Sequence, residues 1–322
     1  MSTTITNASV EDEIERHTDL HALLCALEGD ASLFLPGQLR ERLIALDDLD
    51  AGFGGFDLEG FSRCTSSCQH QRAKALRLQL EAANSELYQS VRSDIVSCGR
   101  PRALLQWLED AASDDERKGP LPGLGFDYRD ELVSGVLQLL EPCEPNLHAS
   151  PEMVPYQPTP VRHILHLIAA AAIAEDDVFV DLGAGLGHVP LLVSMIAGAR
   201  SFGVEVEAAY VASAQKCAQS LHLGRVQFIA QDARDADLSR GTVFYLYSPF
   251  KGSILDDVLS ALRNESVRRP IKICSLGPCT QRISKETWLK ASALSDTGRV
   301  TVFDTLWCRE GSNPTTLPPA DF

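Results

Sequence analysis

The sequence has no cluster of lysine and arginine residues and no long apolar run. Asp and Glu outnumber Lys and Arg by 44 to 29 over 322 residues, which gives a formal net charge of -15. A protein surface that grips phosphate backbones needs a basic patch, so nucleic acid is not an expected partner. A bilayer span needs ~20 apolar residues. The longest run, 164–174, is too short and contains His166, so we expect no membrane partner.

Paired cysteines and targeting signals are also missing. The nine cysteines are odd in number, and Cys64, Cys68 and His70 have no second ligand pair at the spacing of a zinc site. The first residues, M-S-T-T-I-T-N, lack the basic start and apolar core of a secretory signal. These features predict reduced thiols, no metal site and a cytoplasmic location.

The acidity is concentrated in the first half of the chain. Residues 1–150 hold 26 Asp and Glu against 13 Lys and Arg, whereas residues 151–322 hold 18 against 16. Apolar residues recur at helical spacing up to residue 145, which predicts an all-α region. The proline-rich stretch from Pro142 to Pro160 predicts extended chain. We therefore expect two domains, 1–145 and 146–322, the first serving as an acceptor lid or an interaction module.

Beyond residue 160 the pattern changes to strands that alternate with helices. After an apolar helix over 161–173, strands are predicted at 178–181, 201–205, 226–230, 243–247, 271–275 and 299–304, and helices near 188–197, 207–221, 252–263 and 284–293. Short loops between alternating elements are typical of the α/β class, with a doubly wound and mostly parallel sheet.

The stretch V-F-V-D-L-G-A-G-L-G-H, residues 178–188, is the centre of this region. A buried strand leads to Asp181, and Gly183, Gly185 and Gly187 follow before a helical apolar pattern. Glycine lets the backbone approach a ligand closely, and the helix start beyond offers N–H groups that have no partner within the helix. Dinucleotide sites use the spacing G-x-G-x-x-G without a leading Asp, so the pattern argues against NAD.

Three further strand ends carry residues suited to the same ligand. Glu205 ends the second strand, where an acid about 20 residues beyond the glycines can accept ribose hydroxyl protons. Asp232 follows the third strand, where it can face an adenine amino group. The fourth strand breaks at Y-S-P-F and leaves Tyr247, Ser248 and Phe250 beside the site. Ligands of open α/β sheets bind beyond the carboxyl ends of the strands, so we expect one shared site.

These motifs resemble those of class I S-adenosylmethionine-dependent methyltransferases over residues 155–305. The glycine turn is similar to the family's D-x-G-x-G-x-G motif, and Y-S-P-F stands where the family places its substrate-facing motif. The resemblance implies a Rossmann-like sheet of seven strands, S-adenosylmethionine as cofactor and direct in-line methyl transfer. Y-S-P-F has one proline, unlike the motif of enzymes that methylate amino groups of bases.

Finer motifs resemble the Dot1-like branch, the seven-strand lysine methyltransferases. These are Y-Q-P-T-P (156–160), S-P-F-K-G (248–252) and L-S-D-T-G-R-V-T-V (294–302). The sequence departs from that branch because it lacks basic segments that would grip a nucleosome, and because its acidic first half matches no motif of the branch.

The motifs and the resemblance together assign roles to individual residues. We predict catalytic positions at Tyr247 and Ser248, cofactor contacts at Tyr156, Thr159, Asp181, Gly183, Ala184, Gly185, Glu205, Asp232 and Ala233, and acceptor contacts at Tyr128, Pro249 and Phe250. Simpler interpretations stay open for several of them: Tyr156 and Thr159 are also suited to a turn, and Glu205 to a solvated loop. Tyr247 is also suited to core packing, and Asp232 to the surface. Tyr128 is also suited to the start of a helix, where the helix dipole favours the acids that follow it in the first turn.

The predicted function is methyl transfer to a small-molecule acceptor. A protein lysine acceptor, as in the Dot1-like branch, is the first alternative. A non-catalytic protein that binds S-adenosylmethionine, with the helical half as an interaction module, is the second. The intact glycines and Glu205 favour an enzyme over the second alternative. The acceptor atom and the oligomeric state are left open.

Overall fold

The computed structural model describes residues 20–53, 64–98, 101–115, 125–142, 151–292 and 298–306. The chain divides into two compact units. One comprises Met1–Ser97 with Asp127–Val136, and the other comprises Cys98–Phe126 with Leu137–Phe322. Each unit has its own hydrophobic core. The functional division at residue 145 stays a prediction.

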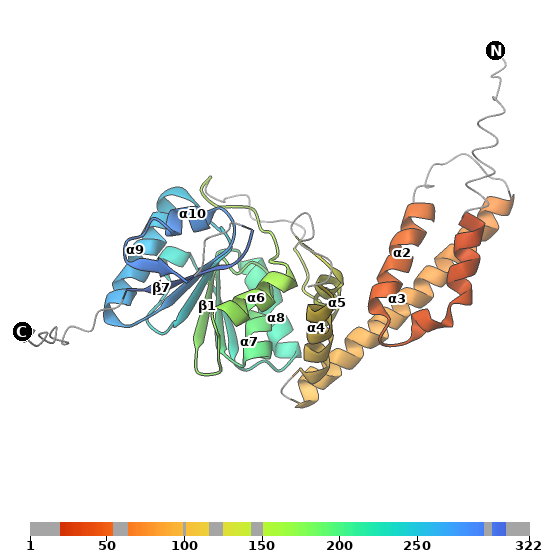
Figure 1. Ribbon diagram of the computed structural model, residues 1–322, viewed down its shortest axis with the longest axis horizontal. Helices are drawn as coiled ribbons and strands as arrows, with labels where there is room; N and C mark the ends of the chain where they lie inside the picture. Colours follow the sequence, from red (N-terminus) through yellow and green to blue (C-terminus); the bar gives the residue numbers. More distant parts are fainter. Residues whose placement is uncertain are drawn as a thin grey trace, which may run out of the picture. The chain divides into compact units, whose positions relative to one another are not determined.

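The described part of the first unit consists of helices, as the apolar spacing predicts. Its elements are a helix over 20–29, the 3₁₀ helix η1 (Ala31–Phe34), α2 (Leu39–Phe53), α3 (Cys64–Cys98) and most of α5 (Tyr128–Leu137) (Figure 1). Small and branched apolar side chains from the first four of these elements form one core: Leu24, Leu33, Ala45, Leu49, Ala73, Leu76 and Leu80. Burial of one apolar stripe per helix stabilises this unit.

A buried arginine joins three elements of the helical unit. The Arg42 side chain is 0% exposed, and its Nε donates a hydrogen bond of 2.6 Å to Oδ1 of Asn84 on α3. Its Nη1 donates to the carbonyls of Leu33 and Leu35, at 2.9 and 2.7 Å. These bonds use Nε and Nη1, whereas Nη2 has no partner among the described residues, and they hold η1, α2 and α3 in one arrangement.

The second unit contains a seven-stranded, mostly parallel sheet. Its strands are β1 (Val178–Leu182), β2 (Arg200–Glu205), β3 (Val226–Ala230), β4 (Val243–Leu246), β5 (Lys272–Ser275), β6 (Leu289–Ala291) and β7 (Thr301–Thr305). Their order is β3-β2-β1-β4-β5-β7-β6, and β7 runs antiparallel to both of its neighbours. The chain reverses its winding direction between β1 and β4, so the carboxyl ends of these strands flank a crevice where ligands bind in such sheets. The predicted fold class is confirmed.

Helices cover both faces of this sheet. Figure 1 shows α6 (Val161–Ala170), α7 (His188–Ala197) and α8 (Ala208–Ser220) on one face, and α9 (Gly252–Arg268) and α10 (Cys279–Ile283) on the other. Helix α4 (Arg102–Asp115) also belongs to this unit. The apolar stripe of α9 packs its Val258 and Leu262 against Val180 of β1 and Phe244 of β4. This packing fixes the crevice because both strands end there.

The predicted helix over 284–293 is wrong. Residues Leu289–Ala291 form β6, which pairs antiparallel with β7 in the register Leu289 opposite Thr305. Trp288 packs against the core beside this strand. The pairing and the packing override the local helical spacing, as tertiary contacts often do for short segments. Residues 294–297 of the L-S-D-T-G-R-V-T-V motif lie outside the described residues.

No helix within the described ranges combines the length and apolar character that crossing a bilayer requires.

Candidate active site

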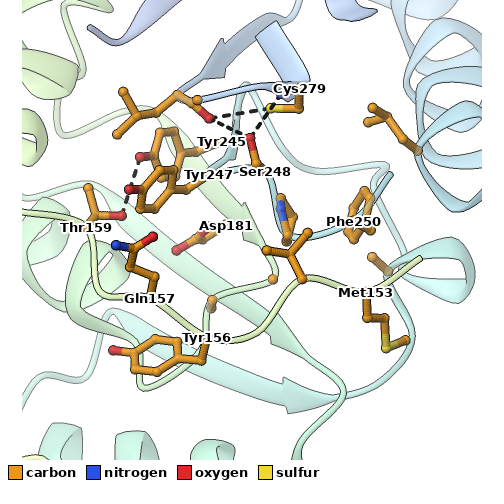
Figure 2. Close-up of a pocket in the computed structure, with 18 of the residues that line it drawn as sticks. Met153, Tyr156, Gln157, Thr159, Asp181, Tyr245, Tyr247, Ser248, Phe250 and Cys279 are labelled. Carbon is orange, nitrogen blue, oxygen red and sulfur yellow. Dashed lines mark hydrogen bonds between the residues drawn. The ribbon is translucent and has the colours of Figure 1, made fainter. Parts of the chain in front are cut away.

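A cavity of about 1360 Å³ opens at the carboxyl ends of β1, β2 and β4. Its walls come from the glycine turn after β1, the end of β2, the turns after β3 to β5, and residues 151–160, which we call the strap (Figure 2). It brings together most of the predicted site residues: Tyr156, Thr159, Asp181, Gly183, Ala184, Glu205, Asp232, Ala233, Tyr247, Ser248, Pro249 and Phe250. Parallel strands place their carboxyl ends at one edge, which explains this convergence of residues that are distant in sequence.

The glycine turn is fixed by close neighbours on two sides. Gly183 has φ of +88°, and a Cβ there would lie 2.2 Å from Cβ of Pro249. Gly185 has φ of +52°, and a Cβ there would lie 2.2 Å from Cε2 of Tyr156. Only glycine combines positive φ with such contacts. These two glycines are therefore needed for the strap and the Y-S-P-F turn to pack onto the site.

Glu205 joins the end of β2 to the glycine turn. Its Oε2 accepts a hydrogen bond of 2.8 Å from the Gly185 N–H, and its Oε1 accepts one of 2.9 Å from the Glu207 N–H. An ionised carboxylate has about four acceptor positions, so both oxygens keep a lone pair for a ligand. The side chain is thus held at the cavity wall before any ligand arrives.

Asp181 contributes a buried acid to the same wall. The residue is 3% exposed and lines the cavity, and its carboxyl group points into it (Figure 2). Burial, and secondarily the charge of Glu205, raises the pKa of Asp181 well above its ordinary value. A cationic group in the cavity would reverse this effect because it stabilises the ionised carboxylate.

The strap is tied to the Y-S-P-F turn and to the start of α9. The Val154 N–H donates to the Pro249 carbonyl at 3.0 Å, and Met153 forms an antiparallel bridge with Phe250. Oε2 of Glu152 accepts from the Ser253 hydroxyl at 2.8 Å and from the Ile254 N–H at 3.1 Å. These bonds lower the pKa of Glu152, and the positive end of a helix favours a carboxylate.

Tyr156 covers the glycine turn from the strap. Its hydroxyl lies 3.1 Å from Nδ1 of His188, and its ring packs tilted against Tyr210 with 5.3 Å between ring centroids. Burial lowers the pKa of His188 to about 4, so the imidazole is neutral at neutral pH. Burial also raises the pKa of Tyr156. The pair is therefore an uncharged hydrogen bond that orients the Tyr156 ring.

Aromatic side chains line the far end of the cavity, after β4. The Tyr245 hydroxyl lies 3.4 Å from Oγ1 of Thr159, and Tyr247 lines the cavity nearby (Figure 2). Burial raises the pKa of Tyr247, so its side chain is a phenol at neutral pH. It can donate or accept a hydrogen bond there but does not act as an ionised base.

Ser248 lines the cavity and also makes two hydrogen bonds to the turn after β5. Its Oγ donates to the Leu276 carbonyl and accepts from the Cys279 N–H, both at 3.0 Å. The residue has φ of +44°, which is uncommon outside glycine. Because the single hydroxyl proton is already used, Ser248 holds the turn after β4 against the turn after β5. Its predicted catalytic role stays a prediction.

The remaining predicted residues differ in their surroundings. Asp232 accepts three hydrogen bonds from Arg234, at 2.7 to 3.0 Å, which lower its pKa. Phe250 is 6% exposed and packs in the core while it borders the cavity. Tyr128 begins α5 in the helical unit, so its predicted acceptor contact stays a prediction.

Several cavity and strap residues were not predicted from sequence, among them Glu152, Gln157, Arg162 and Tyr245. Glu152 accepts a hydrogen bond from Ser253 at the start of α9, about a hundred positions later in the sequence. Lys251, the N-cap residue of α9, makes no capping hydrogen bond with its side chain. A helix start without a local cap was the available signal. Nothing in the local pattern indicates Gln157 or Arg162. Among the described residues, no group of His, Cys, Asp and Glu side chains is arranged to hold a metal ion.

Comparison with known proteins bears on the region that supplies the strap, the glycine turn and Glu205 to this cavity. Residues 153–244 match the family model described as "Histone methylation protein DOT1". No curated protein matches the chain. The family match spans the strap, β1 to β3 and the first part of β4, and it ends before the Y-S-P-F turn.

Similar solved structures are methyltransferases of several kinds. An RNA methyltransferase from Salinibacter ruber in complex with S-adenosyl-L-homocysteine is 26% identical over 51% of this chain and 100% of its own, with a TM-score of 0.38. A geranyl diphosphate C-methyltransferase from Streptomyces coelicolor is 21% identical over 36% and 44%, with a TM-score of 0.31. A putative methyltransferase, yhhF, from Escherichia coli is 18% identical over 48% and 90%, with a TM-score of 0.37.

The family match therefore supports the resemblance seen in the motifs: over residues 153–244 the α/β unit is similar to the Dot1 family of methyltransferases.

Proposed function

We propose that this chain transfers a methyl group from S-adenosylmethionine to a small-molecule acceptor held beside the cofactor. The size of the cavity carries this proposal. Pockets for a single drug-sized ligand have volumes of about 300–1,000 Å³. The cavity measures about 1360 Å³ and continues from the glycine turn to the aromatic residues after β4, so a donor and a compact acceptor fit together.

The donor half suits a nucleoside that carries a cation. Glu205 keeps a lone pair on each oxygen that could accept from the ribose hydroxyls, and Asp232 and Ala233 line the same cavity, where we assign them to the adenine. The buried acid of Asp181 faces the same space with a raised pKa. A sulfonium or ammonium group would relieve that unfavourable burial, which supports S-adenosylmethionine as the ligand.

The part of the cavity after β4, which we assign to the acceptor, positions the acceptor and excludes water more than it transfers protons. S-adenosylmethionine supplies an activated methyl group, so the protein's task is mainly alignment and exclusion of water. The Tyr247 phenol can accept a hydrogen bond from an N–H or O–H group of the acceptor. This bond would orient the acceptor's lone pair toward the methyl group. Tyr245 and Phe250 are 1% and 6% exposed, and they keep the surroundings apolar.

A labelling experiment tests the class of acceptor. The purified chain is incubated with methyl-labelled S-adenosylmethionine and a cell extract, and the products are separated by size. We expect label in the small-molecule fraction. Label only in macromolecules would refute the small-molecule acceptor, and label in neither fraction, together with cofactor binding, would support a non-catalytic binding protein.

Methylation of a protein lysine is the second candidate, and the match to a histone methylation family favours it. The match ends at Phe244, before the residues that we propose to face the acceptor, so it bears chiefly on the donor half. Protease treatment of the labelled extract separates the two candidates. Label that becomes small only after proteolysis supports a protein acceptor.

A further inference from the structure

Arg162 is a cavity residue that neither the motifs nor the proposed donor contacts use. It follows the strap as the second residue of α6 and lines the cavity. Its Nε is buried and has no hydrogen-bond partner among the described residues. Buried polar groups are nearly always hydrogen-bonded, and this unpartnered donor belongs to a residue that lines the cavity, so a ligand in the cavity can supply its partner.

The guanidinium of Arg162 is also held in place. Gly125 has φ of +77°, and a Cβ there would lie 1.7 Å from Cζ and 1.9 Å from Nη2 of Arg162. The planar group therefore lies directly against the Gly125 backbone, in space that any other residue would fill. An arginine fixed in this way presents its fork of N–H donors without losing much side-chain entropy on binding.

The charges around the cavity make Arg162 distinct. Among the described lining residues, five are acids: Asp181, Glu205, Glu207, Asp232 and Asp256. The cations are Arg162, Lys251 and Arg282, and Arg282 is paired with both Asp256 and Glu286. Lys251 is exposed at the start of α9. Arg162 is thus the lining guanidinium that has no carboxylate partner in the described protein.

We infer that Arg162 binds a carboxylate group of a ligand in this cavity. A guanidinium fork matches the two oxygens of a carboxylate, with two parallel N–H···O bonds. Two ligands can supply this group, the amino-acid end of the methyl donor or a carboxylate on the acceptor. The inference rests on the proposed function because it assumes that the donor and the acceptor share the cavity.

Binding of two analogues of the methyl donor tests whether the carboxylate comes from the donor. S-adenosylhomocysteine carries the carboxylate, whereas methylthioadenosine lacks the amino-acid end. If Arg162 binds the donor, Arg162→Gln weakens calorimetric binding of S-adenosylhomocysteine by about 10- to 100-fold, the effect of losing one charge-assisted contact. Binding of methylthioadenosine stays unchanged. Arg162→Lys keeps the charge but loses the fork of N–H donors. Its affinity for S-adenosylhomocysteine should therefore lie between those of the original protein and Arg162→Gln.

Labelled products distinguish the second source. If the carboxylate belongs to the acceptor, both donor fragments bind Arg162→Gln as tightly as they bind the original protein. Methylation of an acidic small molecule, isolated by anion exchange from the labelled extract, then falls by a similar factor. Arg200→Gln is the matched control, because Arg200 is an exposed arginine at the opposite end of β2.

Thermal unfolding separates binding from a structural role. Because Nε of Arg162 has no partner among the described residues, Arg162→Gln should leave the unfolding temperature of the ligand-free chain unchanged or higher. Unchanged donor binding and unchanged methylation in Arg162→Gln would overturn the inference. Failure of the unsubstituted chain to bind S-adenosylhomocysteine would instead overturn the proposed function.

Discussion

The carboxylate of Glu205 accepts a hydrogen bond of 2.8 Å from the backbone N–H of Gly185. One side chain at the end of β2 thereby holds the turn after β1 and keeps acceptor positions for a ligand. Glu205→Ala should weaken calorimetric binding of S-adenosylmethionine by about 10- to 100-fold, because charge-assisted hydrogen bonds of this kind are lost. Glu175→Ala is the control, since Glu175 pairs with Arg225 on the surface. Equal affinity in both variants would remove Glu205 from the cofactor site.

Asp181 should make donor binding depend on pH. Burial and Glu205 raise the pKa of Asp181 in the free protein, and the sulfonium of S-adenosylmethionine favours its ionised form. Binding then releases a proton, so affinity rises with pH up to the raised pKa of the free protein and levels off above it. The slope is at most about tenfold per pH unit for one proton. S-adenosylhomocysteine, with a neutral sulfur, should show a weaker dependence, and Asp181→Asn should show none.

The same carboxyl group affects stability without ligand. The folded protein holds this proton to a higher pH than the unfolded chain does, so its contribution to stability falls as pH rises above 3.8 toward the raised pKa. Asp181→Asn removes this loss. The variant should gain unfolding temperature relative to the original protein at pH 8 more than at pH 4. A larger gain at pH 4 would contradict the burial effect.

Replacement of Gly185 by alanine should destabilise the protein more than the strain of its positive φ alone would. An alanine Cβ at Gly185 would meet the Tyr156 ring at 2.2 Å, whereas at Gly198, with φ of +71°, the nearest atom is 3.7 Å away. Gly198→Ala should therefore cost roughly 1–2 kcal/mol from left-handed strain. Gly185→Ala should cost more in chemical denaturation and should also weaken donor binding. Equal costs would show that Tyr156 moves aside freely.

Two neighbouring tyrosines offer a matched test of the acceptor end. Tyr247→Phe should lower kcat by about tenfold or more if its phenol orients the acceptor, with donor affinity unchanged. Tyr245→Phe removes the hydroxyl that meets Thr159 and should instead cost about 1 kcal/mol of stability. Full methyl transfer by Tyr247→Phe would make Tyr247 a packing residue.

The sequence predicts best where a function depends on local pattern. The buried strand, the glycine turn and the acid that ends the next strand lie within 30 residues, and both strand ends are where the pattern indicates. Roles that depend on distant partners are not predictable in this way. Ser248 is an example, because its hydroxyl partners come from the turn after β5. Glu152 is another, since it serves a helix that begins at residue 252.

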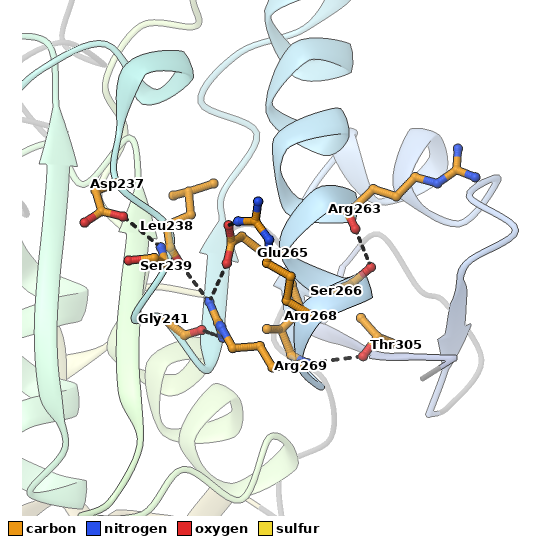
Figure 3. A network of polar contacts seen from close by, with 11 residues as sticks. Asp237, Leu238, Ser239, Gly241, Arg263, Glu265, Ser266, Arg268, Arg269 and Thr305 are labelled. Atoms are coloured by element: carbon orange, nitrogen blue, oxygen red, sulfur yellow. Dashed lines mark hydrogen bonds and ion pairs between the residues drawn. The ribbon is translucent and has the colours of Figure 1, made fainter. Parts of the chain in front are cut away.

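The end of α9 shows the same limit in the fold. Nη2 of Arg269 donates to the Leu238 carbonyl at 2.7 Å, and the guanidinium also contacts the Gly241 carbonyl and Glu265 (Figure 3). These bonds join the helix end to the loop before β4. Basic residues after a helix are common, so the pattern alone does not show that this arginine fastens two segments almost thirty positions apart.

The attachment of the strap determines how a ligand reaches the cavity. Backbone pairing of Val154 with Pro249 and of Met153 with Phe250 closes the seam between the strap and the turn after β4. Passage through that seam would break these backbone hydrogen bonds, which costs free energy. Donor and acceptor must therefore enter and leave elsewhere along the rim, and the two sides of the seam should move as a single body during turnover.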